Sequence, residues 1–215
     1  MKSVLDNDII YKSICYRLGP SVRGLLGETT EDIGALTAAR FVLEAKIRRA
    51  RLQRAPELVL VDLEEMIDAT VPIDPSADEQ ALAASLEWLA QRRGFSLGTG
   101  ESQLCAVTAG RSLARLATGD KRAIVAMEAI LADEPRLERL VGTVICLEQL
   151  IRRLLTEGAT FTAVQASICQ EPSTDVALAI CFSCDAGGSS ELSAIEGLDS
   201  YIRDLRVNAP SVLTP

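Results

Sequence analysis

Acidic side chains follow several short apolar segments of this sequence, each at a point where a helix is expected to begin. Asp6 and Asp8 come after an apolar start, Glu101 comes after a glycine-rich break, and Asp120 comes after a second apolar segment. Carboxylate oxygens are the ligands that hard cations such as Mg²⁺ prefer, and Mg²⁺ usually keeps several waters, so few protein ligands suffice. The four acids are therefore candidates for a divalent-metal site.

A structural role competes with this interpretation. Aspartate is a common N-cap, and the helix dipole stabilises a carboxylate in the first turn of a helix. Taken singly, each of the four acids is more often such a cap than a ligand. Together they favour a shared site, because ligands of an open α/β sheet bind beyond the carboxyl ends of its strands, where acids from distant sequence positions converge.

The composition places this site in one globular chain. The sequence has 215 residues, of which 48% are hydrophobic, which suits one domain, or a domain with a smaller appended one. No run approaches the ~18–20 consecutive apolar residues of a membrane span, and the acidic start does not fit a secretory signal. We therefore expect a cytoplasmic protein without a membrane partner.

Charge argues against one class of function. A net charge of −8 does not suit a general nucleic-acid coat, although acids gathered in a metal site leave a nuclease possible. Basic residues are nevertheless clustered, in a run between residues 46 and 54 and in the pairs Arg92-Arg93, Lys121-Arg122 and Arg152-Arg153. Such a run is usually a solvated helix face, and an edge that contacts phosphate is the alternative.

The histidine and cysteine content excludes further classes of catalytic and metal site. No histidine is present, which excludes Ser-His-Asp and Cys-His nucleophile pairs and any zinc site that contains histidine. Cys181 and Cys184 form a lone C-x-x-C pair, and a structural zinc would need two more thiolates. We expect the six cysteines to be buried, reduced thiols, with redox chemistry and metal binding as the lesser alternatives.

Apolar periodicity predicts alternating strands and helices in the first part of the chain. Residues 22–26 fit a strand or a turn, and residues 58–67 fit either a helix or a strand. The remaining expectations are strands at 1–5 and 113–118, helices at 9–18, 76–93, 101–109 and 122–131, and one long amphipathic helix from residue 33 to about 54. This alternation favours a parallel sheet with covering helices.

Beyond residue 135 the pattern is mainly helical. Helices are expected at 137–155, 160–169, 174–184 and 192–205, and residues 208–215 are expected to be loosely ordered. The apolar stripe near residues 147–155 should pack on the sheet or form a dimer surface. We therefore divide the chain into an α/β domain at 1–135 and a mainly helical C-terminal extension at 136–215.

Three segments together resemble the PIN-domain family. Leu5-Asp6-Asn7-Asp8-Ile9-Ile10 is similar to the first-strand motif, and Ala117-Thr118-Gly119-Asp120-Lys121-Arg122-Ala123 is similar to the late Thr-x-Asp-Lys segment. Gly100-Glu101-Ser102-Gln103-Leu104-Cys105-Ala106 takes the place of the acidic helix start between them. The resemblance covers about residues 1–135 and implies a PIN-like three-layer fold, with a central parallel sheet flanked by helices.

PIN-domain proteins are typically Mg²⁺- or Mn²⁺-dependent ribonucleases, including toxins of toxin–antitoxin pairs. The resemblance implies an endoribonuclease in which Asp6, Glu101 and Asp120 hold the metal and Asp8 supports them. The remaining acidic position of the family lies on the long helix, where Glu44 is the candidate. The alternative for Glu44 is an exposed helix residue, paired with an arginine one turn away.

Three residues around Asp120 complete the expected site. Thr118 would orient a ligand or a water, and Lys121 or Arg122 would contact the phosphate of an RNA substrate, which metal-activated water would hydrolyse. An antitoxin or another protein partner and a homodimer are further expectations. A non-catalytic PIN-like interaction module and a hydrolase of small phosphates remain the alternatives.

Overall fold

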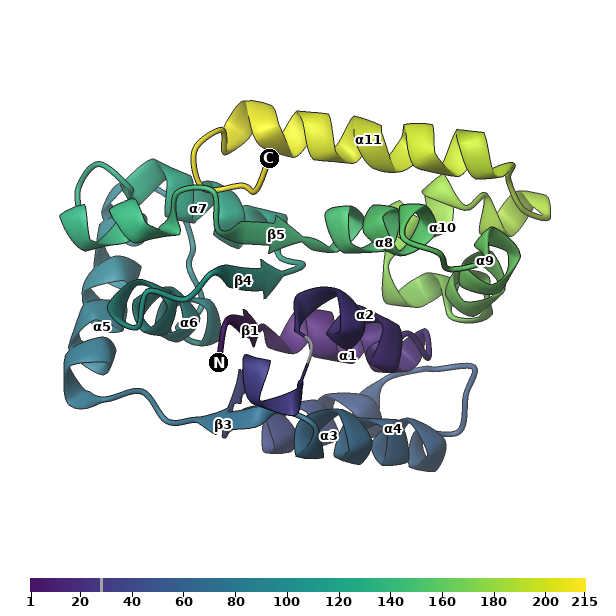
Figure 1. Cartoon of the computed structure of the whole chain (residues 1–215), viewed down its shortest axis with the longest axis horizontal. Helices are drawn as coiled ribbons and strands as arrows, with labels where there is room; N and C mark the ends of the chain where they lie inside the picture. Colours follow the sequence, from purple (N-terminus) through teal and green to yellow (C-terminus); the bar gives the residue numbers. More distant parts are fainter. Residues whose placement is uncertain (28) are drawn as a thin grey trace.

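Five parallel strands form one sheet in the order β3-β2-β1-β4-β5 (Figure 1). The strands are β1 (Ser3–Leu5), β2 (Ile33–Leu36), β3 (Val71–Ile73), β4 (Arg115–Thr118) and β5 (Val144–Cys146). The computed structural model describes residues 1–27 and 29–215. The chain moves outward from β1 to β3 and then returns to β4, so the direction of winding reverses between β1 and β4. In an open α/β sheet this reversal point is where ligands bind.

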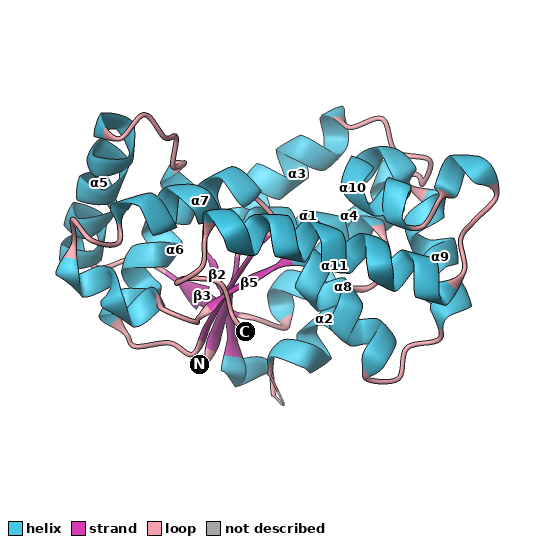
Figure 2. Ribbon diagram, turned by 90° about the horizontal axis from the view of Figure 1, so that it is seen from above, coloured by secondary structure: helices cyan, strands magenta, loops and turns pink. Residues whose placement is uncertain are grey.

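Helices cover both faces of the sheet, on either side of the strands (Figure 2). They are α1 (Asn7–Cys15), α2 (Gly19–Leu26), α3 (Ala39–Arg49), α4 (Pro56–Asp68), α5 (Ala77–Arg92), α6 (Thr99–Gly110), α7 (Lys121–Ile130), α8 (Leu147–Thr156), α9 (Phe161–Gln170), α10 (Val176–Cys181) and α11 (Glu191–Asn208). The predicted α/β class, with a parallel sheet flanked by helices, is confirmed.

Two hydrophobic cores form because successive strand residues point to opposite faces of the sheet. Leu5 packs in a core with helices α1 to α4 and α8 to α10, whereas Val4 packs in a core with α5 to α7. The last helix, α11, contributes Leu198 to the first core and Leu205 to the second. It therefore passes beside the edge of the sheet and closes both cores.

The predicted long helix from residue 33 to about 54 is wrong, because this segment contains β2 before α3. All four residues of β2 are buried, and the strand pairs with β1 on one side and β3 on the other. A strand buried on both faces is a continuous apolar run, which periodicity alone does not distinguish from a helix. Gly34 fits this place because a Cβ there would strike Met1 and Ile73.

The same ambiguity affects the C-terminal region, where the predicted helix at 137–155 is divided into the end of a 3₁₀-helix (Pro135–Leu140), strand β5 and helix α8. The expected domain boundary at residue 135 thus precedes the last strand of the sheet, and residues on both sides of it share the two cores. The prediction of a loosely ordered end is also wrong, since Val212 and Leu213 are buried and Leu213 forms a β-bridge with Val144.

Two further expectations are corrected. Residues 22–26, predicted as a strand or a turn, belong to helix α2. Cys169 and Cys184 form a disulfide that joins α9 to the segment after α10, whereas Cys15, Cys105, Cys146 and Cys181 are free and buried, as predicted. In residues 1–27 and 29–215, no helix has both the length and the apolar character needed to cross a membrane.

Candidate active site

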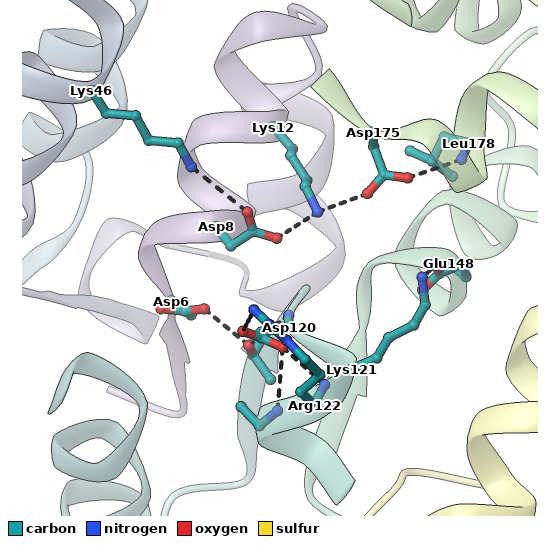
Figure 3. A network of polar contacts seen from close by, with 12 residues as sticks. Asp6, Asp8, Lys12, Lys46, Asp120, Lys121, Arg122, Glu148, Asp175 and Leu178 are labelled. Carbon is teal, nitrogen blue, oxygen red and sulfur yellow. Dashed lines mark hydrogen bonds and ion pairs between the residues drawn. The ribbon is translucent and has the colours of Figure 1, made fainter. Parts of the chain in front are cut away.

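A hollow of about 590 Å³ opens at the carboxyl end of the sheet, beside the point where the strand order reverses. It brings together acids and bases that are far apart in the sequence, several of which are drawn in Figure 3. The charged residues that line it are Asp6, Asp8, Glu101, Asp120 and Asp175 with Lys12, Lys46, Lys121 and Arg122. The four acids singled out from the sequence therefore face one space.

Asp6 lies at the base of this hollow, directly after β1. It occupies the N-cap position of α1, yet its side chain makes no capping hydrogen bond. Instead, Asp6 Oδ2 accepts a hydrogen bond of 2.9 Å from the hydroxyl of Thr118, which ends β4 (Figure 3). Only 2% of Asp6 is exposed. Its carboxylate is thus held by the neighbouring strand and is not used to begin the helix.

The surroundings of Asp6 disfavour its negative charge. Burial and the nearby carboxylates of Glu101 and Asp8 raise the pKa of Asp6 to about 7, and the hydrogen bond from Thr118 opposes them only in part. A shortage of positive charge at a buried carboxylate is what a bound cation would relieve. Thr118, predicted to orient a ligand or a water, is fully buried, and its hydroxyl holds the carboxylate of Asp6.

Asp8 has cationic partners from two helices. Its carboxylate lies 2.6 Å from Lys12 Nζ and 3.9 Å from Lys46 Nζ. Lys12 Nζ also lies 2.7 Å from Asp175, so this ammonium group is held between two carboxylates (Figure 3). Burial disfavours the charge of Lys12, but Asp8 and Asp175 outweigh it and raise the pKa of Lys12. Lys12 is therefore held in its charged form and contributes a positive charge to the hollow.

Glu101 and Asp120 serve partly as helix-start residues. Glu101 lies in the first turn of α6, with its carboxylate folded back over Gly98. Asp120 Oδ1 caps α7 through the backbone N–H groups of Arg122, at 2.8 Å, and Ala123, at 3.3 Å. Within residues 1–27 and 29–215, no three Asp, Glu, Cys or His residues form a group that could hold a metal ion as they stand.

Lys121 and Arg122 differ in their availability to a substrate. Lys121 points away from the acids of the hollow and forms an ion pair with Glu148 at 2.5 Å (Figure 3). Its ammonium group also lies over the ring of Tyr201. Arg122 is 90% exposed in its side chain and is paired only loosely with Asp120, at 3.4 Å. Of these two predicted phosphate contacts, Arg122 is the one free to move to a ligand.

Glu44 does not reach the hollow. It lines a separate depression with Arg40 and Arg48, while Leu43 and Lys46 of the same helix face the acids. Successive residues of a helix are turned by about 100°, so a residue next to an inward-facing one points elsewhere. The prediction of Glu44 as a site residue misjudged this rotation.

Sequence reasoning missed two residues that line the hollow, Asp175 and Lys12, and also Glu148, which pairs with Lys121 outside it. Asp175 caps α10 through the N–H of Leu178, and a Ser-Thr-Asp run before an apolar segment is a signal for such a cap. Glu148 is 1% exposed and comes two residues after β5, the same spacing that Asp120 has after β4. Periodicity predicts β5 as part of a helix, so the sequence does not reveal that Glu148 follows a strand. Lys12 is a lone base on a helix that is otherwise buried.

No protein-family model matches the chain, and no curated protein sequence matches it either. The assignment of a function therefore depends on the geometry and charge of this hollow.

Proposed function

We propose that this protein is a divalent-metal-dependent endoribonuclease with a PIN-like fold. The position of Asp6 is the observation that carries the proposal. Its carboxylate follows the central strand β1 at the reversal point of the sheet, is not used as a cap, and faces the same hollow as Glu101 and Asp120. A parallel sheet in the order 3-2-1-4-5 supports the PIN-like assignment, because it supplies the strand ends that the three motif segments require.

The donors fit Mg²⁺ or Mn²⁺. The candidate ligands Asp6, Glu101, Asp120 and Asp8 offer only carboxylate oxygens, the ligand type that these cations prefer. Metal binding requires the carboxylate of Glu101 to turn away from Gly98, and Oδ2 of Asp120, which does not cap the helix, to turn away from Arg122. Both movements are side-chain rotations. When bound, a divalent ion supplies an activated water and neutralises charge on the scissile phosphate.

The residues of the chain have separate tasks in this proposal. Thr118 holds Asp6 in one orientation through its 2.9 Å hydrogen bond. Lys12 and Lys46 place positive charge on the other side of Asp8, where the phosphate of a substrate would lie. Arg122 extends from the rim and adds a guanidinium, which matches the geometry of a phosphate. These bases offset the repulsion between the acids and an anionic substrate.

Single-turnover cleavage of a labelled RNA tests the proposal, with Mg²⁺, with Mn²⁺ and with a chelator. Asp6→Asn keeps the size of the side chain and removes its charge, and it should slow cleavage by at least ~10²-fold, the loss seen when one electrostatic stabiliser is removed. Glu44→Gln is the matched control, because it removes a carboxylate outside the hollow. Equal rates in Asp6→Asn and the wild type would identify a contaminating nuclease. A mononucleotide ester assayed in parallel separates this activity from hydrolysis of small phosphates.

A second candidate function, a non-catalytic PIN-like interaction module, is favoured by one observation. Lys12 already neutralises Asp8 and Asp175, and Asp120 already caps a helix, so three of the acids have structural partners. Val42 of α3, which lines the hollow, and its neighbour Phe41 are 51% and 69% exposed, and they would then be the surface for a protein partner, such as an antitoxin or a second copy. Absence of cleavage together with a melting temperature indifferent to Mn²⁺ would support this candidate.

A further inference from the structure

A second groove, distinct from the acidic hollow, has arginine as the most frequent residue of its lining. It has a volume of about 680 Å³ and lies between the start of β4, helix α8 and helix α11. Its basic residues are Arg115, Arg152, Arg153, Arg203 and Arg206. We refer to it as the arginine groove. Asp199 is the acidic residue that lines it, so the groove is strongly positive in a protein whose net charge is −8.

Not all of these arginines are neutralised by neighbours. Arg152 pairs with Asp199 across the groove, and Arg153 pairs with Glu157 on its own helix. In the described part of the chain, neither Arg115 nor Arg203 forms an ion pair or a side-chain hydrogen bond. Arg115 acts only at longer range, where it assists Arg153 in lowering the pKa of Glu157. Two guanidinium groups thus remain available to an anion.

The arginine groove and the acidic hollow lie at opposite ends of the same strand. Arg115 begins β4, and Asp120 follows its carboxyl end, which at about 3.3 Å per residue places the two backbones roughly 16 Å apart. Helix α11 connects the two places on the outside. Its Tyr201 contacts Lys121, which lines the hollow, whereas Arg203 and Arg206, on another side of the same helix, line the groove. One extended polyanion that passes around α11 can therefore contact both.

We propose that the arginine groove binds the phosphate backbone of single-stranded RNA and guides it toward the acidic hollow. The choice of RNA rests on the proposed nuclease function. Arginines from three elements line the groove, and its volume is large compared with one phosphate group, which occupies the space of only a few water molecules of about 30 Å³ each. The groove therefore suits a ligand with a chain of phosphates. Guanidinium groups bind phosphate oxygens through two parallel hydrogen bonds and also stack on bases.

Binding of a short fluorescent oligouridylate, measured by anisotropy in a chelator, tests this proposal without dependence on catalysis. The informative variant is Arg115→Ala with Arg203→Ala, since neither side chain forms a hydrogen bond or ion pair with the described residues that could be lost. Arg51→Ala with Arg92→Ala is the matched control, because it removes the same charge from exposed positions outside the groove. Hydrolysis of a small phosphodiester with Mn²⁺ is measured on all the proteins, so that a failure of the metal site is seen separately.

The groove variant should bind oligouridylate at least ~10-fold more weakly and lower the slope of log affinity against log salt by about 1.4, or ~0.7 for each lost phosphate contact. The control should retain most of the affinity, and hydrolysis of the small ester should be the same in both variants. Equal RNA affinity in the two variants, or no RNA binding by the wild type, would overturn the proposal. Equal or tighter binding of inorganic polyphosphate or of a polyglutamate peptide would overturn RNA as the occupant.

Discussion

Asp175 Oδ2 lies 2.7 Å from Lys12 Nζ, and this ion pair joins the helices after β5 to the first helix of the chain. Both side chains are largely buried, with 9% and 11% of their surfaces exposed. Asp175 also caps α10, so one carboxylate begins a helix and fixes a charge of the acidic hollow. The C-terminal helices are thereby part of the candidate site.

Breaking this pair should destabilise the protein in a non-additive way. Lys12→Met and Asp175→Asn should each lower the free energy of unfolding, because each leaves a buried charge with fewer partners. The double variant should lose less than the sum of the two, with a coupling of roughly 1 kcal/mol or more. Urea unfolding measures the free energy of unfolding of the wild type, the two single variants and the double variant. Asp185→Asn, at an exposed position of the same region, is the control. Strict additivity would show that the pair contributes no stability.

Divalent cations should stabilise the folded protein, because a ligand that binds only the native state shifts the equilibrium by mass action. At a Mn²⁺ concentration of about 100 times the dissociation constant the gain is about 2.7 kcal/mol, which a melting curve detects readily. Asp6→Asn should abolish most of this gain, whereas Glu44→Gln should keep it. A wild-type melting temperature that does not respond to millimolar Mn²⁺ would contradict a metal site in the hollow.

In the metal-free protein, the contribution of Asp6 to stability should fall as the pH rises from about 4 to about 7. The pKa of Asp6 is raised from 3.8 to about 7 in the folded state, first by burial and then by Glu101, so in this range the folded state binds a proton that the unfolded state releases. Proton binding by Asp6 stabilises the folded state at low pH. This stabilisation is lost as the pH rises through the pKa that Asp6 has in the folded state. At about 1.4 kcal/mol per pH unit, the change contributed by Asp6 is a few kcal/mol.

Urea unfolding at several pH values in a chelator measures this dependence. Asp6→Asn cannot titrate, so the difference in stability between this variant and the wild type should change across the same interval and stay constant above about pH 7. A constant difference from pH 4 to pH 8 would show that Asp6 has an ordinary pKa.

Reduction of the Cys169–Cys184 disulfide should lower the free energy of unfolding. The two cysteines are 15 residues apart, and opening a loop of this size restores chain entropy worth about 3 kcal/mol to the unfolded state. Cys184→Ser should resemble the reduced wild type and should not respond further to a reductant. If the reductant weakens the variant as much as the wild type, a change elsewhere in the protein is responsible.

The positions of the main acids follow from local sequence. Asp6 comes directly after β1, Asp120 comes two residues after β4, and Glu101 comes in the first turn of a helix, so a parallel sheet places them at one edge without any detail of packing. Glu44 shows the limit of this reasoning, because a residue in the middle of a helix is placed by the rotation of that helix against its neighbours. Periodicity also predicts helices where the fully buried strands β2 and β5 lie, since both faces of each strand are apolar.

The sequence by itself determined the α/β class, the parallel sheet and the acids at the ends of β1 and β4, because these depend on periodicity and on residues close together in the chain. Only the tertiary structure decided which charges those acids meet. Lys12 contacts Asp175 from more than 160 positions away, and the arginine groove combines β4, α8 and α11. Contacts of this kind depend on how helices pack around the sheet, and no short stretch of sequence encodes that packing.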